Sequence, residues 1–190
     1  MNKFSRYAAI ILMALIAPGA ALDFAPLNAQ EGKIVPYVPT PPEIVERMLE
    51  LAQVKTGDIL YDLGSGDGRI VITAAKKYGV RAIGFEIDPE RIKESRENIK
   101  KAGVEKLVEI RQQDIRTVDL SGATVLTMYL LPEVNLMIRP NIWKQMKPGS
   151  RVVSHDFDMG DWKPVKFERV KSNSNWDHDL YLWHVEAGKK

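Results

Sequence analysis

The chain has 190 residues, of which 45% are hydrophobic, and its formal net charge at pH 7 is +2. This length suits one domain with a full hydrophobic core, and we expect a monomer. The absence of cysteine excludes disulfides and thiolate metal sites. Beyond the first 29 residues the chain carries 25 basic and 24 acidic residues. A nucleic-acid partner is therefore not expected, because such binders usually show a basic excess.

Residues 1–29 have the pattern of a targeting segment. Lys3 and Arg6 precede an apolar run from Ala8 to Ala17, and small residues with helix breakers follow. This pattern predicts an export signal that is cleaved after Ala21 or after Ala29. The alternative is an uncleaved membrane anchor. We expect a protein that is exported to the periplasm or held at a membrane by its N-terminus.

Residues 30–57 are predicted to be an extended lead-in followed by a helix. The pattern predicts Thr40 as the N-cap, Pro41 as the first helical residue and Glu43 as the third, and together they form a capping box. An apolar helical face then continues to Val54. We expect this segment to precede a core domain that spans residues 58–190.

The start of that core contains a glycine-rich turn between a strand and a helix. Residues 59–61 indicate a strand, and Gly64, Gly66 and Gly68 interrupt the pattern before a helix over 69–78. Such glycines let the backbone approach a ligand at the amino end of a helix. Arg69 stands where a dinucleotide-binding fingerprint needs a third small residue, and no Gly-Lys-Ser or Gly-Lys-Thr follows. NAD-type and P-loop sites are therefore excluded.

The elements after this turn alternate between strand and helix. We predict strands over 81–86, 108–112, 124–129 and 151–155, with helices over 89–103 and 132–146. Two further alternating runs, 165–171 and 180–186, are joined by a polar loop at 172–179 and indicate a hairpin. This order predicts an α/β fold: a mostly parallel sheet built from right-handed βαβ units, with helices on both faces and a C-terminal antiparallel hairpin.

Acidic residues stand at the carboxyl ends of the first three predicted strands. Asp62 and Glu86 end two of them, Asp114 follows the third, and Asp67 lies in the glycine-rich turn. In an open α/β sheet these strand ends line one crevice, so the four carboxylates are expected around one ligand. A pyrophosphate would be repelled there, whereas S-adenosylmethionine carries a positive sulfonium and a positive ammonium. The charge pattern favours S-adenosylmethionine as the cofactor.

The motifs Asp62–Gly68 and Gly84–Asp88 resemble motifs I and II of the class I S-adenosylmethionine-dependent methyltransferases. The upstream Pro36–Pro41 is similar to a signature of the group that includes archaeal and mitochondrial protein-lysine methyltransferases. The resemblance implies a Rossmann-like class I methyltransferase fold and N-methylation of protein lysine side chains. It also implies that the segment before the first helix covers the methionine end of the cofactor, with Tyr37 and Thr40 as the contacts.

The same resemblance implies the other cofactor-binding residues. Asp62, Gly64 and Gly66 are expected to hold the amino-acid end of the cofactor. Glu86 is expected to bind the ribose hydroxyls, and Asp114 the adenine amino group. For Asp114 the alternative is a helix cap or a turn residue.

Residues that follow the fourth and fifth predicted strands lie, by topology, near the transferred methyl group. Tyr129 follows the fourth, whereas His155 and Asp156 end and follow the fifth. We predict Tyr129, Asp156 and His155 as catalytic residues that orient an acceptor amine, with packing as the alternative for each. His155, Asp156 and Asp158 also have the ingredients of a metal site. Because the chain has only three histidines, we expect no metal.

Two other functions stay open from the sequence. A methyltransferase for a small molecule or a lipid would place Leu130, Leu131 and tryptophans in a closed pocket. A cofactor-binding module without catalysis is compatible with export, because S-adenosylmethionine is made in the cytoplasm. The run Tyr129–Pro132 departs from the Asn/Asp-Pro-Pro-aromatic motif of enzymes that methylate nucleobases or glutamine. The leading prediction is therefore a protein-lysine methyltransferase.

Overall fold

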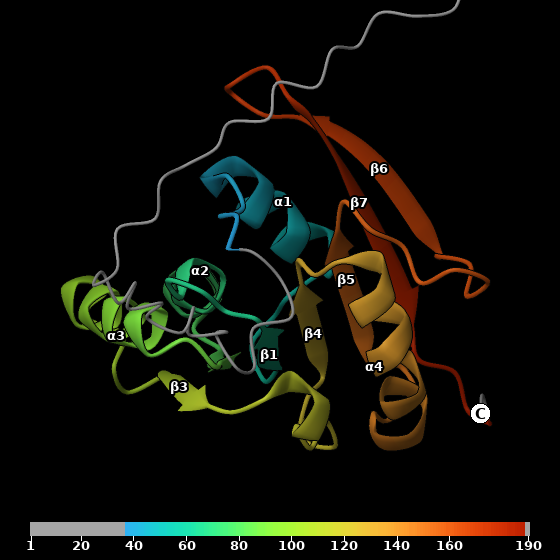
Figure 1. Ribbon diagram of the computed structural model, residues 1–190, viewed down its shortest axis with the longest axis horizontal. Coiled ribbons are helices and arrows are strands. Elements are labelled where there is room, and N and C mark those ends of the chain that lie inside the picture. The colour runs from blue at the N-terminus through green and yellow to red at the C-terminus, as the bar shows by residue number, and fades with distance from the viewer. Residues whose placement is uncertain (1–36, 189–190) are drawn as a thin grey trace, which may run out of the picture. The chain divides into compact units, whose positions relative to one another are not determined.

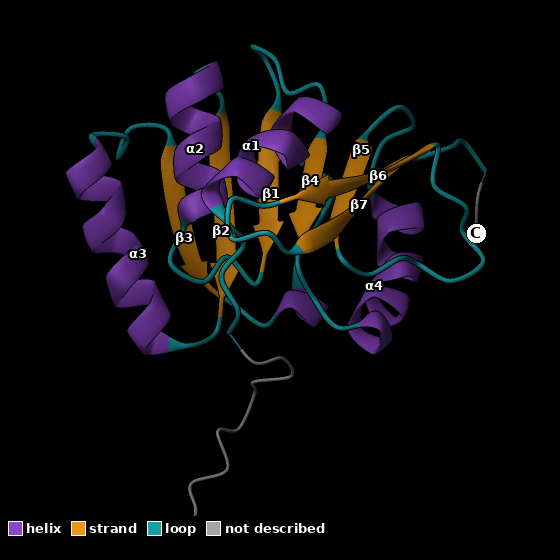
Figure 2. Ribbon diagram, turned by 90° about the horizontal axis from the view of Figure 1, so that it is seen from above, coloured by secondary structure: helices purple, strands orange, loops and turns teal. Residues whose placement is uncertain are grey.

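The structure is a computed structural model that describes residues 37–188, and its centre is a seven-stranded mixed sheet. The strands are β1 (Ile59–Leu63), β2 (Arg81–Glu86), β3 (Val108–Gln112), β4 (Val125–Met128), β5 (Arg151–His155), β6 (Lys166–Lys171) and β7 (Asp177–His184). Their order across the sheet is β3-β2-β1-β4-β5-β7-β6 (Figure 2). Neighbours among β1 to β5 pair in parallel, and β7 runs antiparallel to both β5 and β6. The predicted fold class is confirmed.

Helices cover both faces of the sheet (Figure 1). The helices are α1 (Pro42–Leu51), α2 (Arg69–Tyr78), α3 (Pro89–Ala102) and α4 (Pro132–Gln145), with a short 3-10 helix, η1 (Ile115–Thr117). None of the helices within residues 37–188 has the length and apolar character needed to cross a bilayer. The predicted signal or anchor, residues 1–29, lies outside the described residues, as does the lead-in up to residue 36.

Two hydrophobic cores lie on opposite faces of the sheet. One contains the inward faces of α1, α2 and α3, and the other contains that of α4. Successive strand residues alternate between them, as the pleat of a strand requires: Leu60 and Val125 belong to the first core, Tyr61 and Leu126 to the second. Both faces of the central strands are therefore buried, which explains their nearly continuous apolar sequence.

The register of the parallel strands brings their carboxyl ends to one edge. Leu63 pairs with Phe85 on one side and Met128 on the other, and Met128 pairs with Ser154. The residues that follow these positions therefore emerge side by side at the edge where open α/β sheets bind ligands. The predicted strand ends are correct to within one residue for β2, β3 and β5.

The C-terminal hairpin has a shorter loop than predicted. β7 begins at Asp177 rather than at residue 180, because Asp177–Asp179 pair with Arg169–Lys171 of β6. The polar sequence of this segment indicated a loop, but an ion pair of 2.6 Å between Arg169 and Asp179 stabilises the pairing of the two strands.

The predicted capping box at the start of α1 is wrong. Pro41 occupies the N-cap position, and no side chain caps the helix. The Thr40 hydroxyl instead contacts Nδ1 of His155 at 3.0 Å, and the Glu43 carboxylate accepts a hydrogen bond of 2.6 Å from the backbone N–H of Asn173. Both polar side chains therefore connect the start of α1 to the C-terminal part of the chain. These are tertiary contacts, which a local sequence motif does not predict.

Candidate active site

The glycine-rich turn leaves no room for side chains at two of its contact points. Gly66 has φ of 53°, and a Cβ atom built on it would lie 2.5 Å from the ring of Tyr37. A Cβ on Gly84, in the neighbouring strand β2, would lie 2.5 Å from Oγ of Ser65. The backbone of the turn is thus packed closely between β2 and the segment that precedes α1. Glycine is therefore required at both positions by contacts within the protein, which hold the turn in its compact shape.

Glu86 at the end of β2 holds this turn in shape. Its carboxylate accepts hydrogen bonds from three backbone N–H groups: Gly66 at 2.9 Å, Ile87 at 2.8 Å and Asp88 at 3.0 Å. A carboxylate offers about four lone-pair positions, so one acceptor position remains for a ligand hydroxyl. Glu86 is therefore both a structural residue of the turn and a candidate for the predicted ribose contact.

Asp62 is a buried carboxylate, 2% exposed, at the centre of the site. Thr127 of β4 donates a hydrogen bond of 2.7 Å to it. Burial raises the pKa of Asp62 to about 7, and the negative charges of Glu86 and Asp67 act in the same direction. Among residues 37–188, no basic side chain pairs with it. A cationic ligand group would supply the missing partner.

Residues 37–40, which we call the covering segment, lie against the glycine-rich turn. The ring of Tyr37 packs on Gly66 and lies 4.9 Å from the guanidinium carbon of Arg91. The carbonyl of Thr40 accepts a hydrogen bond of 2.7 Å from Nη1 of Arg69. The structure thus places both predicted contact residues of this segment beside the turn, and their covering role towards the cofactor stays a prediction.

Two of the predicted acidic residues are engaged with arginines. Asp67 forms an ion pair of 2.6 Å with Arg69, which compensates its charge within the turn, and its place beside a ligand stays a prediction. Asp114 caps η1 by accepting from the backbone N–H of Arg116 at 2.9 Å, and it also pairs with the Arg116 guanidinium. It lies next to Gln113, whose N–H bonds the carbonyl of Glu86 at 3.0 Å. Its assignment to adenine stays a prediction.

Tyr129, His155 and Asp156 come together at the ends of β4 and β5. The rings of Tyr129 and His155 have centroids 3.9 Å apart. Burial raises the pKa of Tyr129 to about 12, and a hydrogen bond with Asp156 and the charge of this carboxylate add to the effect. The phenol is therefore protonated at neutral pH. The three predicted catalytic residues form one cluster, although their role is untested by this geometry.

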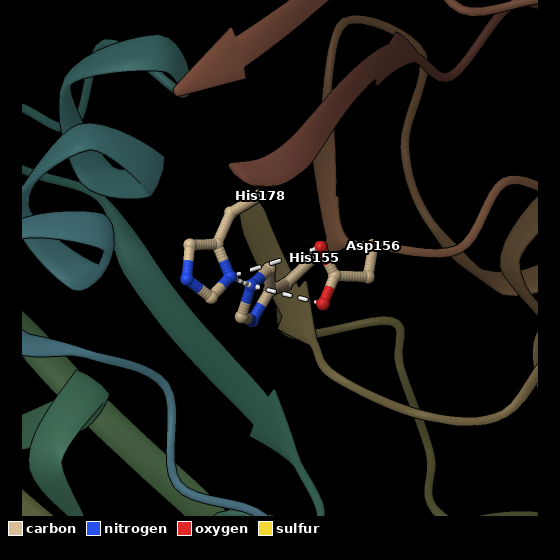
Figure 3. Close-up of side chains that lie close together, drawn as sticks. All are labelled: His155, Asp156 and His178. Carbon is tan, nitrogen blue, oxygen red and sulfur yellow. Dashed lines mark hydrogen bonds and ion pairs between the residues drawn. The ribbon is translucent and has the colours of Figure 1, made fainter. Parts of the chain in front are cut away.

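His178 of β7 completes the cluster, and the sequence analysis missed it. Its Nδ1 lies 2.8 Å from Nε2 of His155 and 3.8 Å from a carboxylate oxygen of Asp156 (Figure 3). Position 178 falls in the predicted loop at 172–179, where the sequence indicates no hydrogen-bond partner for the histidine. Only the antiparallel pairing of β7 with β5 brings it to His155.

The ligand atoms of His155, Asp156 and His178 all lie within 4.8 Å of one another, which is close enough for a metal ion. Both ring nitrogens of His155 already have hydrogen-bond partners, namely Thr40 and His178. Burial lowers the pKa of His155 to about 4, so its ring is neutral at physiological pH. Hydrogen bonding accounts for the cluster, and the absence of a metal stays a prediction.

Asn135 of α4 is a second polar residue that the sequence analysis missed. It is fully buried, and its amide nitrogen donates to the carbonyls of Phe157 and Asp158 at 3.1 Å and 3.2 Å. These bonds fix the loop that follows β5, immediately beyond Asp156. Asparagine within an apolar helix pattern was the only available signal.

Comparison with known proteins identifies the kind of protein that has this fold and site. A model of the ANTKMT methyltransferase domain matches residues 62–166. A protein-lysine N-methyltransferase of Saccharolobus islandicus is 51% identical over 82% of this chain and 96% of its own length. The adenine nucleotide translocase lysine N-methyltransferase of Mus musculus is 32% identical over 88% of this chain and 70% of its own.

A solved structure extends the comparison to the cofactor. The RNA methyltransferase from Salinibacter ruber in complex with S-adenosyl-L-homocysteine is 52% identical, with a TM-score of 0.75, over 80% of this chain and 97% of that one. The glycine-rich turn and the buried Asp62, which pairs with no basic side chain among residues 37–188, fit a ligand of this kind, which carries an ammonium group. The fold, the site and these relatives define a class I S-adenosylmethionine-dependent methyltransferase. The chain belongs to the ANTKMT methyltransferase family.

Proposed function

We propose that this methyltransferase N-methylates lysine side chains of proteins. The observation that carries the proposal is the cluster of Tyr129, His155 and Asp156 at the strand ends beside the glycine-rich turn. It supplies a hydroxyl, a carboxylate and an aromatic surface where an amine would meet the methyl group. The names of the Saccharolobus and mouse relatives support lysine as the acceptor.

The chemistry needs alignment more than it needs a strong catalytic base. S-adenosylmethionine supplies a methyl group that is already activated by a positive sulfur. An acceptor lysine must present a neutral amine, although its ordinary pKa is about 10.4. Asp156 attracts the ammonium form into the site, and burial of the amine then lowers that pKa, so the proton leaves to solvent before attack. The neutral nitrogen bonds to the methyl carbon as the bond from that carbon to sulfur breaks, and S-adenosylhomocysteine leaves. The Tyr129 hydroxyl keeps its proton and donates a hydrogen bond to Asp156, so the lone pairs of the phenol oxygen accept an amine N–H and aim the nitrogen lone pair.

The cofactor roles in this proposal follow the order of the strand ends. Asp62 neutralises the ammonium of the amino-acid end, and the backbone of Gly64 and Gly66 accommodates it. Glu86 uses its remaining acceptor position for the ribose. Asp114 receives the adenine amino group. The covering segment closes over the methionine end through Tyr37 and Thr40.

RNA is the second candidate acceptor, because the Salinibacter protein is named an RNA methyltransferase. The described residues argue against it: they carry 22 basic and 23 acidic side chains, whereas an RNA-binding domain usually has a basic excess. The acids Asp156 and Asp158 also follow β5, at the edge where the acceptor would bind. Their charges attract an ammonium and repel a phosphate backbone.

The test is a transfer reaction that does not presuppose the acceptor. The full chain is incubated with methyl-tritiated S-adenosylmethionine and an extract of host cells, and the products are separated into protein, RNA, lipid and small molecules. The proposal predicts label in protein. Label in RNA, lipid or small molecules without label in protein would overturn it.

We further propose that residues 1–29 export the chain or anchor it at a membrane. The basic start and apolar run of this segment support the proposal. Fractionation of cells that express the full chain with a C-terminal tag tests it. Recovery in the periplasm or the membrane fraction is expected, and recovery in the cytosol alone would contradict it.

A further inference from the structure

His178 is the member of the cluster whose role the reaction does not explain. Its side chain is 13% exposed, its Nδ1 faces Nε2 of His155, and its Nε2 is buried without a partner among the described residues. Two carboxylates stand near the ring: Asp156 at 3.8 Å and Glu43 of α1. It reaches the cluster from the hairpin, on the opposite side of His155 from the covering segment.

His155 lies between His178 and the covering segment. Its ring is fully buried: Nδ1 contacts the Thr40 hydroxyl at 3.0 Å, whereas Nε2 contacts Nδ1 of His178 at 2.8 Å and lies 3.4 Å from a carboxylate oxygen of Asp156. A neutral imidazole has one donor and one acceptor nitrogen. Because the Thr40 hydroxyl can donate or accept, it pairs with Nδ1 in either tautomer, and the bond depends instead on the orientation of the ring, which the contact of His178 with Nε2 holds.

Thr40 connects this chain of hydrogen bonds to the cofactor site. Its hydroxyl contacts His155, whereas its carbonyl accepts from Arg69, which pairs with Asp67 in the glycine-rich turn. Three residues earlier, Tyr37 packs on Gly66. If Thr40 loses its bond to His155, only the contacts with Arg69 and Gly66 still hold the covering segment.

We propose that His178 is a positioning residue that holds the covering segment closed over the cofactor, by orienting His155 towards Thr40. The inference rests on the proposed role of residues 37–40. Through it, the C-terminal hairpin contributes to cofactor retention although it stands on the other side of β5 from the glycine-rich turn.

Other contacts between the hairpin and α1 do not replace this bond. Arg47 of α1 binds the carboxylate of Glu168 at 2.6 Å and 2.7 Å, and Glu43 binds the backbone of Asn173. These contacts fix the helix that follows Thr40. They leave the Thr40 hydroxyl itself dependent on His155.

The experiment measures the affinity and the dissociation rate of S-adenosylhomocysteine for full-chain variants by calorimetry and stopped-flow. His178→Ala is expected to weaken binding about tenfold, mainly through faster dissociation, because a buried hydrogen-bonding group loses its partner. His178→Asn, whose amide can occupy the place of Nδ1, is expected to stay within about twofold of the wild type. His184→Ala, at an exposed position of the same strand, is the matched control and is expected to bind normally.

A double-mutant cycle separates positioning from general destabilisation. Thr40→Val is expected to weaken binding as much as His178→Ala, and the double variant to be no weaker than either, because both changes break one chain of hydrogen bonds. Effects that multiply would overturn the inference, as would normal binding by His178→Ala. Equal losses in His178→Asn and His178→Ala would overturn it as well. If His178→Ala does not fold, the affinity of Thr40→Val for S-adenosylhomocysteine is compared with that of Thr40→Ser. The same two changes are then measured in the His178→Asn background, which provides the same test.

Two controls distinguish the possible causes of failure. Tyr37→Ala tests the covering role alone: if it binds S-adenosylhomocysteine normally, the proposed role of residues 37–40 fails and the inference fails with it. If Tyr37→Ala binds weakly while His178→Ala binds normally, only the inference about His178 fails. A stoichiometric divalent metal in the purified wild type, lost in His178→Ala, would replace the hydrogen-bond account with a metal site.

Discussion

Thr127 of β4 donates a hydrogen bond of 2.7 Å to the carboxylate of Asp62 at the end of β1, and no basic side chain in the described part of the chain pairs with that carboxylate. Burial raises the pKa of Asp62, and the hydrogen bond from the Thr127 hydroxyl lowers it by less. The site therefore holds an acid that is poised to ionise when a cation arrives.

This arrangement predicts a pH dependence of cofactor binding. Because burial raises the pKa of Asp62 to about 7, the free protein must lose this proton before the carboxylate can bind the ligand ammonium. Affinity for S-adenosylhomocysteine should fall by up to about tenfold per pH unit below that value and level off above it. Calorimetry across this range measures the effect. Asp62→Asn should bind at least about tenfold more weakly and show no such dependence; an unchanged slope in this variant would contradict the assignment.

The same carboxylate makes an opposite prediction for stability. The folded-state pKa of about 7 lies above the ordinary aspartate pKa of about 3.9, so the folded form holds its proton more tightly than the unfolded chain does. The ligand-free protein should therefore lose stability as pH rises from about 4 to about 7. Asp62→Asn should raise the melting temperature at pH 8 but not at pH 4. A lower melting temperature at pH 8 would show that the negative charge is stabilising.

Glu86→Ala should weaken binding of S-adenosylhomocysteine at least tenfold (~1.4 kcal/mol or more). The variant loses the proposed ribose contact and also the three backbone hydrogen bonds that shape the glycine-rich turn. Calorimetry measures the affinity, and thermal unfolding in the absence of ligand measures the second loss. Glu90→Ala, on the exposed side of α3, is the control. Unchanged affinity in Glu86→Ala would rule out its role.

Tyr129→Phe should lower the rate of methyl transfer by about 10- to 100-fold, because the amine loses the group that aligns it. Binding of S-adenosylhomocysteine should stay within about twofold of the wild type, since the proposed role concerns the acceptor. Single-turnover kinetics separate the two effects. Tyr78→Phe, at the end of α2, is the matched control. A normal rate in Tyr129→Phe would remove the phenol from the mechanism.

Asp58 and Arg151 form a buried ion pair that should dominate local stability. Their side chains are 6% and 14% exposed, and Arg151 also donates to the carbonyls of Ala52 and Gln53. Asp58→Ala leaves this guanidinium without its charged partner and should lower the free energy of unfolding by about 3–5 kcal/mol. Glu109→Ala, which breaks an exposed pair with Arg111, should cost at most about 1 kcal/mol. Urea denaturation compares them, and equal costs would contradict this account.

Local patterns were sufficient to predict most of the fold. The helix over 69–78 ends at Gly79, which has φ of 67°, and Asp88 caps the next helix by accepting from the backbone of Glu90, both as the sequence indicates. These features depend on residues close together in the chain. The glycine-rich turn belongs to the same class, because strand, turn and helix follow one another directly.

The missed features depend on distant partners. Thr40 and Glu43 match a capping box, yet tertiary contacts with His155 and Asn173 outcompete that local use. His178 could not be assigned, because its role depends on the antiparallel register of β7 against β5. The sequence therefore predicts the glycine-rich turn, whereas it does not predict the long-range contacts of Thr40, Glu43 and His178.

The measurement that tests the central claim most directly is the identity of the methylated group. Protein labelled by the full chain and methyl-tritiated S-adenosylmethionine is hydrolysed to amino acids, and the labelled product is identified by chromatography and mass spectrometry. The account predicts methylated lysine with the wild type and about 10- to 100-fold less of it with Tyr129→Phe. Label in another amino acid, or label only in RNA, would contradict it.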